Sequence, residues 1–121
     1  MKYKMVVLDL DGTLLSDDKT ISDKNAHILK ILHKQGIHIV IATGRNYYMA
    51  KSLLGRIEAI EPVILANNGA VVRRYINDEF IESNYLDYSI FETIYEIGMK
   101  HGLNPIIHVD EYQQGYDLLY E

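Results

Sequence analysis

Three short apolar runs in the first half of the chain, each followed by a polar break, constrain the fold more than any other feature. The runs occupy residues 3–10, 37–42 and 62–65. Residues 5–8 are apolar at consecutive positions, which is expected of a strand covered on both faces in a parallel sheet. The breaks contain glycine or asparagine and indicate where each strand ends. The first half of the chain therefore predicts three buried strands.

Helical patterns fill the two gaps between these runs. Ser22 can cap a helix over residues 23–35, and Gly36 is suited to end it. The expected buried stripe of this helix comprises Ile28, Leu29, Ile31 and Leu32. A shorter helix is expected over residues 47–54. Strands and helices that alternate with short joints predict an α/β fold with a Rossmann-like parallel sheet and right-handed crossovers.

Both the pattern and the charge change in the second half of the chain. Beyond residue 69 the sequence predicts a hairpin around Asn77-Asp78, with strands over residues 70–75 and 79–84. A helix over residues 88–101 and two strands over residues 105–109 and 115–121 are expected to follow. Residues 1–83 carry 11 basic and 10 acidic side chains, whereas residues 84–121 carry 1 and 7. We therefore expect a domain boundary near Asn84, with one domain over 1–83 and another over 84–121.

Composition excludes several classes of function. The 17 acidic and 12 basic side chains give a net charge of −5, which leaves no basic excess to neutralise a nucleic-acid backbone. The chain has no cysteine, so disulfides, thiolate metal sites and thiol nucleophiles are excluded. Its apolar stretches are too short to cross a bilayer or to form a signal-peptide core. We expect a cytoplasmic protein that binds neither nucleic acid nor membrane.

The strongest chemical signal is the segment Asp9-Leu10-Asp11-Gly12-Thr13, at the carboxyl end of the first expected strand. Ligands of open α/β sheets bind at this edge. Asp9 and Asp11 are two residues apart, so their carboxylates repel each other unless a cation or a proton is shared between them. Mg²⁺ is a natural partner, and one carboxylate could attack phosphorus while the other handles a proton. A plain turn is the alternative for Asp11-Gly12.

A second signal, Ala42-Thr43-Gly44-Arg45, ends the second expected strand. Because the ends of neighbouring strands lie side by side, we expect Thr43 to face Asp9 across the edge of the sheet. A threonine hydroxyl, backbone N–H groups at a helix start and the guanidinium of Arg45 suit an anion such as phosphate. On its own, the segment is equally typical of a threonine helix cap beside a surface arginine.

Together, three segments of the sequence resemble the haloacid dehalogenase (HAD) superfamily of phosphatases, and within it the Cof-like subfamily. The segments are residues 9–15 (DLDGTLL), 41–45 (IATGR) and 67–70 (NNGA). The resemblance implies an incomplete HAD core over residues 1–83, including the hairpin, and the beginning of a truncated α/β cap domain over residues 84–121. It also implies a Mg²⁺-dependent phosphoric monoester hydrolase that acts on small phosphorylated metabolites such as sugar phosphates.

The resemblance implies roles for single residues as well. Asp9 would be the nucleophile that forms an aspartyl-phosphate, and also a Mg²⁺ ligand. Asp11 would protonate the leaving oxygen and then activate water, while its main-chain carbonyl binds the metal. The N–H of Leu10, the hydroxyl of Thr43 and the N–H of Gly44 would hold the phosphate.

Arg45 and Asn68 are weaker candidates for substrate binding. Arg45 would add a fork-shaped donor group to the anion site. Asn68 would lie near the junction of core and cap, although Asn68-Gly69 is more typical of a tight turn.

Two segments that the family requires are missing from the sequence. One supplies a lysine beside the nucleophile, and the other is an acidic Gly-Asp segment that completes the Mg²⁺ site. No Gly-Asp pair occurs in the chain, and Lys100 lies in the wrong segment to be the missing lysine. Phosphoryl transfer depends on neutralising charge, so we expect this chain to be a fragment with little or no activity. Unpaired sheet edges would also allow self-association.

Two other classes of function remain open at this point. A signalling receiver domain shares the length, the acidity, the doubly wound sheet and the use of clustered carboxylates with Mg²⁺. However, the third expected strand ends in Ala66-Asn67, where a receiver needs its phosphorylated aspartate. The other class is a non-catalytic interaction module that pairs with another chain through its sheet edges.

Overall fold

The structure is a computed structural model that describes residues 3–110 and 118–120. Its internal contacts divide the chain into two compact units, Met1–Ser83 and Asn84–Glu121, and each unit is described by itself. The assignment of these units to a catalytic core and a cap stays a prediction. In the described part of the chain, no helix has the length and apolar character needed to span a membrane.

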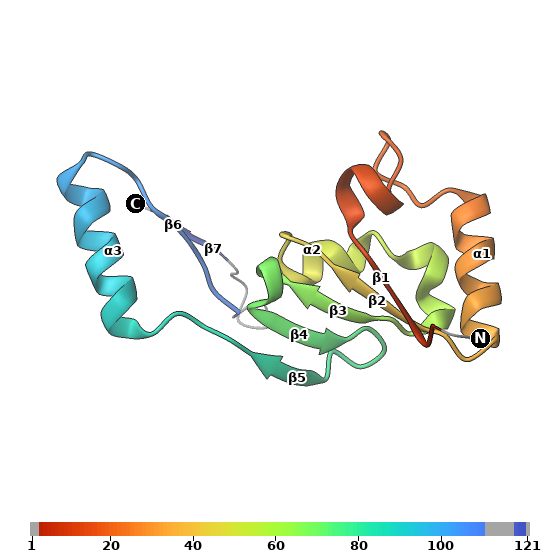
Figure 1. Cartoon of the computed structure of the whole chain (residues 1–121). Helices are drawn as coiled ribbons and strands as arrows, with labels where there is room; N and C mark the ends of the chain where they lie inside the picture. The colour runs from red at the N-terminus through yellow and green to blue at the C-terminus, as the bar shows by residue number, and fades with distance from the viewer. Residues whose placement is uncertain (1–2, 111–117, 121) are drawn as a thin grey trace. The chain divides into compact units, whose positions relative to one another are not determined.

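A five-stranded mixed sheet organises the first unit (Figure 1). Its strands, in spatial and chain order, are β1 (Met5–Leu8), β2 (His38–Ala42), β3 (Val63–Ala66), β4 (Val71–Arg74) and β5 (Phe80–Ser83). The first three strands run parallel, whereas β4 and β5 form a hairpin that extends the same sheet in antiparallel sense. The predicted α/β class with a Rossmann-like parallel sheet is therefore confirmed.

The helices of this unit connect the parallel strands, as the sequence predicts. Helix α1 (Asp23–Lys34) follows β1, while α2 (Tyr47–Ser52) and the short turn η2 (Gly55–Ile60) lie between β2 and β3. The side chain of Ser22 accepts a hydrogen bond from the N–H of Asn25 and so caps α1, as predicted.

The hydrophobic core of the first unit lies on one face of the sheet. Ile39 and Ile41 of β2 and Ile64 of β3 alternate with residues of the opposite face and are almost fully buried. They share a core with buried side chains of the helices and of η2, namely Ala26, Leu29, Tyr47, Ala50, Ile57 and Ile60. This packing fixes the carboxyl ends of β2 and β3 relative to each other.

The prediction that both faces of β1 are covered is wrong. Met5 and Val7 of β1 are 53% and 55% exposed. Both side chains point to the face of the sheet opposite the core, because successive residues of a strand alternate between faces. That face forms a shallow apolar groove, which Val63 and Leu65 of β3 also line. Strand β1 is moreover an edge strand of this sheet.

The predicted buried stripe of α1 is only half right. Leu29 is buried and Leu32 is packed against the core, but Ile28 and Ile31 are 48% and 39% exposed. At about 100° per residue, Ile28 and Ile31 lie roughly 100° and 160° around the helix from Leu29. The helix buries Ala26 beside Leu29 instead, so it contacts the core through a narrower stripe than its composition indicates.

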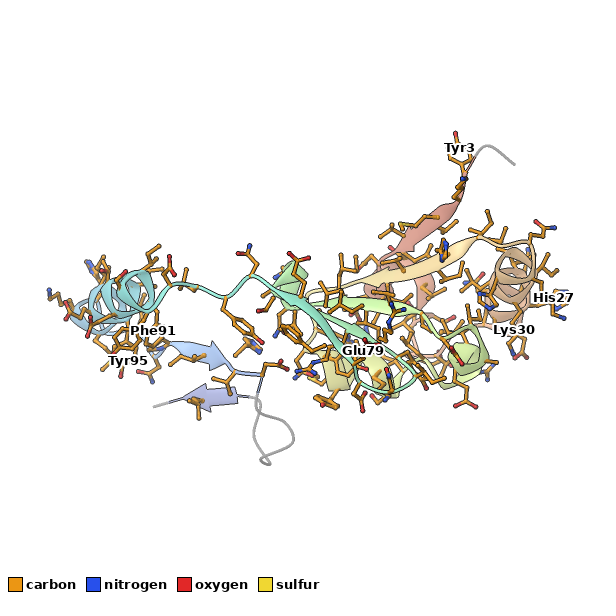
Figure 2. All side chains as sticks on the ribbon, turned by 90° about the horizontal axis from the view of Figure 1, so that it is seen from below. Tyr3, His27, Lys30, Glu79, Phe91 and Tyr95 are labelled. Atoms are coloured by element: carbon orange, nitrogen blue, oxygen red, sulfur yellow. The ribbon has the colours of Figure 1, made fainter. Side chains whose placement is uncertain are left out.

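The second unit consists of helix α3 (Tyr88–Lys100) and the antiparallel strands β6 (Ile106–His108) and β7 (Leu118–Tyr120). Gly102 follows α3 with a φ of 67°, which fits the predicted end of this helix. The predicted last strand over residues 115–121 lies partly outside the described residues. Figure 2 labels Phe91 and Tyr95, neighbouring rings of α3 whose centroids are 5.9 Å apart.

Candidate active site

The candidate site is a pocket at the carboxyl ends of the three parallel strands. Asp9 follows β1, Thr43 and Gly44 follow β2, and Asn68 follows β3. Because these strands are parallel neighbours, their ends lie at the same edge of the sheet. All four residues line one pocket, together with Ala42, Leu65 and Gly69.

Asp9 directly follows β1, and a single wide turn, η1 (Leu10–Leu14), carries Asp11. Leu10 and Leu14 are buried and anchor this turn in the core. Gly12 has a φ of 74°, a left-handed conformation that costs glycine little. The carboxylate of Asp9 accepts a long hydrogen bond, 3.4 Å from the hydroxyl of Thr13. Among the described residues, no cation is paired with Asp9.

The carboxylate of Asp11, in contrast, is held by two cations. Nε of Arg45 lies 2.7 Å from Oδ2 of Asp11, and Nη2 lies 2.7 Å from Oδ1. Nζ of Lys19 lies 2.9 Å from the same Oδ1. Hydrogen bonds from Arg45 and then from Lys19 hold the pKa of Asp11 well below its usual range. The side chain of Asp11 is therefore ionised in this arrangement and turned toward these two cations.

Sequence reasoning missed Lys19, which is presented by a tight loop. Leu15 and Ile21, both buried, pair as an antiparallel bridge at the base of this loop. The carboxylate of Asp18 accepts hydrogen bonds from the N–H and the hydroxyl of Thr20, and Lys19 between them has a φ of 61°. An aspartate two residues before a threonine favours such a turn, and this was the one local signal available.

Thr43 is buried, and its hydroxyl accepts a hydrogen bond from the N–H of Arg45 at 3.2 Å. The side chain of Asn46, not that of Thr43, caps α2 by accepting a hydrogen bond from the N–H of Met49. The alternative reading of Thr43 as the helix cap is therefore wrong. Thr43 instead shapes the loop that carries Arg45 toward Asp11.

The loop after β3 supports the loop after β2. Asn67, Asn68 and Gly69 have successive φ values of 48°, 55° and 91°, which is a strained run for two asparagines. The N–H of Asn67 donates to the carbonyl of Arg45 at 2.8 Å, and the N–H of Asn68 donates to that of Thr43 at 3.0 Å. Asn68 is thus both a turn residue and a pocket residue.

The close approach of these two loops explains the glycine at position 44. A Cβ added to Gly44 would lie 3.1 Å from Oδ1 of Asn68, tighter than ordinary van der Waals contact. Glycine at position 44 therefore lets the side chain of Asn68 contact the backbone of the loop after β2.

The donor set of the pocket edge suits a hard cation only in part. Asp9 offers a carboxylate with no cationic partner in the described part of the chain, and oxygen donors are what Mg²⁺ prefers. The carboxylate of Asp11 is paired with Arg45 and Lys19. The oxygen with which Asp11 can bind a metal is therefore that of its main-chain carbonyl. The described residues contain no group of three or more acidic or histidine side chains that could hold a metal by itself. Mg²⁺ tolerates such a site because it keeps several of its waters.

Comparison with known proteins gives consistent matches. Over residues 6–117, the chain matches the family of haloacid dehalogenase-like hydrolases. Two phosphatases of 5-amino-6-(5-phospho-D-ribitylamino)uracil from Bacillus subtilis, YcsE and YitU, are 28% and 38% identical to it. These alignments cover 84% and 65% of this chain, but only 40% and 29% of the relatives. The chain thus spans less than half the length of these curated relatives.

Solved structures show the same fold. A haloacid dehalogenase-like hydrolase from Bacteroides thetaiotaomicron matches with a TM-score of 0.76 and 32% identity, over 99% of this chain and 44% of that one. A HAD phosphatase from the same organism matches with a TM-score of 0.77 and 29% identity, over 98% of this chain and 41% of that one. The family match extends over most of the chain and includes all three strand ends of the pocket. The chain belongs to the haloacid dehalogenase-like hydrolase family.

Proposed function

We propose that the protein of which this chain is a part or the whole hydrolyses phosphate monoesters of small metabolites, with Asp9 as the nucleophile. One observation supports this most: the carboxylate of Asp9 has no cationic partner among the described residues and lines one pocket with Thr43 and Gly44. A carboxylate beside groups suited to phosphate is the arrangement that covalent phosphoryl transfer needs.

In the first half of the proposed reaction, a carboxylate oxygen of Asp9 forms a bond to phosphorus. The bond between phosphorus and the leaving oxygen breaks, and that oxygen receives a proton from Asp11. The product is an aspartyl-phosphate and a free alcohol. For Asp11 to carry this proton, Arg45 and Lys19 must loosen their hold, since both favour the ionised carboxylate. The phosphoryl oxygens are natural new partners for the guanidinium of Arg45.

In the second half, Asp11 accepts a proton from water while the water oxygen bonds to phosphorus. The bond between phosphorus and Asp9 breaks, which restores the carboxylate and releases inorganic phosphate. The ionised state of Asp11 in the structure suits this base role directly. Thr43, Gly44 and the N–H of Leu10 are the proposed phosphate-binding groups.

Mg²⁺ is the proposed cofactor, and it would supply positive charge beside the transferred phosphoryl group. Asp9 would hold it with a carboxylate oxygen and Asp11 with its main-chain carbonyl. The substrate class is proposed from the relatives, because YcsE and YitU are named as phosphatases of a phosphorylated ribityl compound. Arg45 and Asn68 are proposed to contact such a substrate.

The test is Mg²⁺-dependent binding of orthovanadate, a phosphoryl mimic, which needs no turnover by the 121-residue protein. We expect Asp9→Asn to lower this affinity about a hundredfold or more, because it replaces the charged carboxylate that would bond to vanadium with a neutral amide. Asp17→Asn is the control, because Asp17 is an exposed carboxylate in a nearby loop. Unchanged vanadate binding by the Asp9→Asn variant would show that Asp9 is not the nucleophile.

A further inference from the structure

Two acidic residues that follow β1, Asp9 and Asp11, have opposite surroundings in the structure. The carboxylate of Asp11 receives three N–H donors, two from Arg45 and one from Lys19. From the residues that the structure describes, the carboxylate of Asp9 receives a single long hydrogen bond, from a neutral hydroxyl. Two carboxylates this close in sequence compete for any cation at the edge of the sheet, and among the described residues the cations pair with Asp11.

Arg45 and Lys19 approach Asp11 from different parts of the chain. Arg45 belongs to the loop after β2, which is hydrogen-bonded to the loop after β3. Lys19 comes from the loop between Leu15 and Ile21, whose turn is closed by Asp18 and Thr20. Arg45 contacts both oxygens of the carboxylate, whereas Lys19 adds a second contact to Oδ1.

We propose that Lys19 is a positioning residue that, together with Arg45, keeps the side chain of Asp11 away from the metal position. The metal would then be held by the carboxylate of Asp9 and the main-chain oxygen of Asp11, and the side chain of Asp11 would stay outside its set of ligands. This inference rests on the proposed function. It assigns a role to a residue outside the strand-end segments.

The physical reason is the competition between monovalent and divalent cations for one carboxylate. Lys19 is more than half exposed and Asp11 is 41% exposed, so their pairing is screened and neither partner is buried. If either Lys19 or Arg45 is removed, a divalent ion can displace the remaining one from the carboxylate of Asp11. Without Lys19, Oδ1 of Asp11 keeps one donor only and can turn toward the metal as a further ligand.

The first experiment measures Mg²⁺ affinity by NMR titration of the amides of residues 9–13, in the 121-residue protein and its variants. We expect Lys19→Gln to raise the affinity about fivefold, since it releases one carboxylate oxygen and removes a nearby positive charge. Lys19→Arg should retain the wild-type affinity, because it keeps the charge and a donor. Lys30→Gln is the charge-matched control, on the exposed side of α1 (Figure 2).

The second experiment separates positioning from simple charge. Removal of a charge alone would raise Mg²⁺ affinity whether or not Asp11 has a carboxylate. We therefore repeat the Lys19→Gln comparison in an Asp11→Asn background. The proposal predicts that the fivefold gain falls to about twofold or less there, because the amide of asparagine does not offer a charged ligand. A gain of the same size in both backgrounds would overturn the positioning role.

The outcomes distinguish this inference from the proposed function. If Asp9→Asn abolishes Mg²⁺ binding while Lys19→Gln leaves it unchanged, only the role of Lys19 is wrong. If the wild-type protein does not bind Mg²⁺, or Asp9→Asn binds it as well as the wild type, the proposed metal site is wrong and this inference fails with it. A misfolded variant would show itself by loss of the dispersed amide spectrum, and Lys19→Met, which also removes the charge, would then replace Lys19→Gln in both comparisons.

Discussion

The two units of the chain differ in how they bury their apolar residues. In the first unit, strands and helices share a core in which side chains such as Leu10, Ile41 and Ile64 are fully buried. In the second unit, α3 has no buried residue, and Ile90, Ile94 and Ile97 are each about half exposed. A helix in a protein gains most of its stability from packing an apolar face. Helix α1 has such a buried face, whereas α3 has no buried residue.

This difference matters for the candidate site because all of its residues lie in the first unit. Leu10 directly follows Asp9, and Ile41 lies two residues before Thr43. Both Leu10 and Ile41 are fully buried. The core therefore holds the strand ends in place. The site residues and these core residues belong to one unit, and substitutions in each unit test whether the two units are independent.

The largest effect is expected from Ile64→Ala, in the centre of the core of the first unit. Ile64 is fully buried, so the lost side chain and the cavity should lower the free energy of unfolding by about 2–5 kcal/mol. Ile94→Ala is the matched change in α3, where 56% exposure predicts a change within about 0.5 kcal/mol. Urea denaturation followed by tyrosine fluorescence measures both. Equal losses for the two variants would contradict the difference between the units.

An intermediate effect is expected from Asp78→Asn, in the turn between β4 and β5. The carboxylate of Asp78 accepts hydrogen bonds from the hydroxyl of Tyr47 at 2.7 Å and from Nζ of Lys51 at 2.5 Å, and so fastens the hairpin to α2. Loss of this charged acceptor should cost about 1 kcal/mol. Glu79→Gln is the control, because the pair between Glu79 and Arg74 is half exposed and should contribute little (Figure 2).

The same cluster predicts a dependence of stability on pH. Burial opposes the charge of Asp78, but the hydrogen bonds from Lys51 and Tyr47 prevail and lower its pKa. A carboxyl whose pKa is lowered by folding contributes its full stability above the unfolded value of about 3.9, and loses it as the pH falls through the folded value. Unfolding at pH 7 and at pH 3 should therefore differ less in Asp78→Asn than in the wild type. An unchanged difference would exclude Asp78 as a cause.

The smallest effect is expected from Phe91→Ala in α3, measured by hydrogen exchange of backbone amides. Phe91 contacts Tyr88 and Tyr95 within its own helix. Because the two units are separately compact, the amides of β2 and β3 should keep their protection within about twofold. Loss of protection in β2 and β3 would show that the first unit depends on the second.

The positions of the main elements could be predicted because local signals and the final structure agree. The apolar runs before Asp11-Gly12 and Thr43-Gly44 became β1 and β2, and the cap at Ser22 begins α1. The topology rule for parallel strands then brings Asp9 and Thr43 to one edge of the sheet, where they line the same pocket. Their chemical roles stay predictions.

The features that could not be predicted depend on contacts between distant parts of the chain. The exposure of Met5 and Ile28 follows from which face of each element meets the core, and composition does not reveal that face. The contact of Lys19 with Asp11 depends on how a loop folds back over the turn after β1. Likewise, α2 is capped by Asn46 and not by Thr43, because the path of the loop after Thr43 determines where the helix begins.

The antiparallel hairpin determines where the chain leaves the first unit. Val71 pairs with Ala66 at the end of β3, and Ser83 pairs with Val71, so β4 leads away from the pocket edge and β5 leads back to it. Two antiparallel strands, like any even number of them, return the chain to the edge of the sheet from which it started. Ser83, the last residue of the first unit, therefore lies at the same edge of the sheet as Asp9 and Thr43. A longer turn at Asn77-Asp78 would leave Ser83 at that edge.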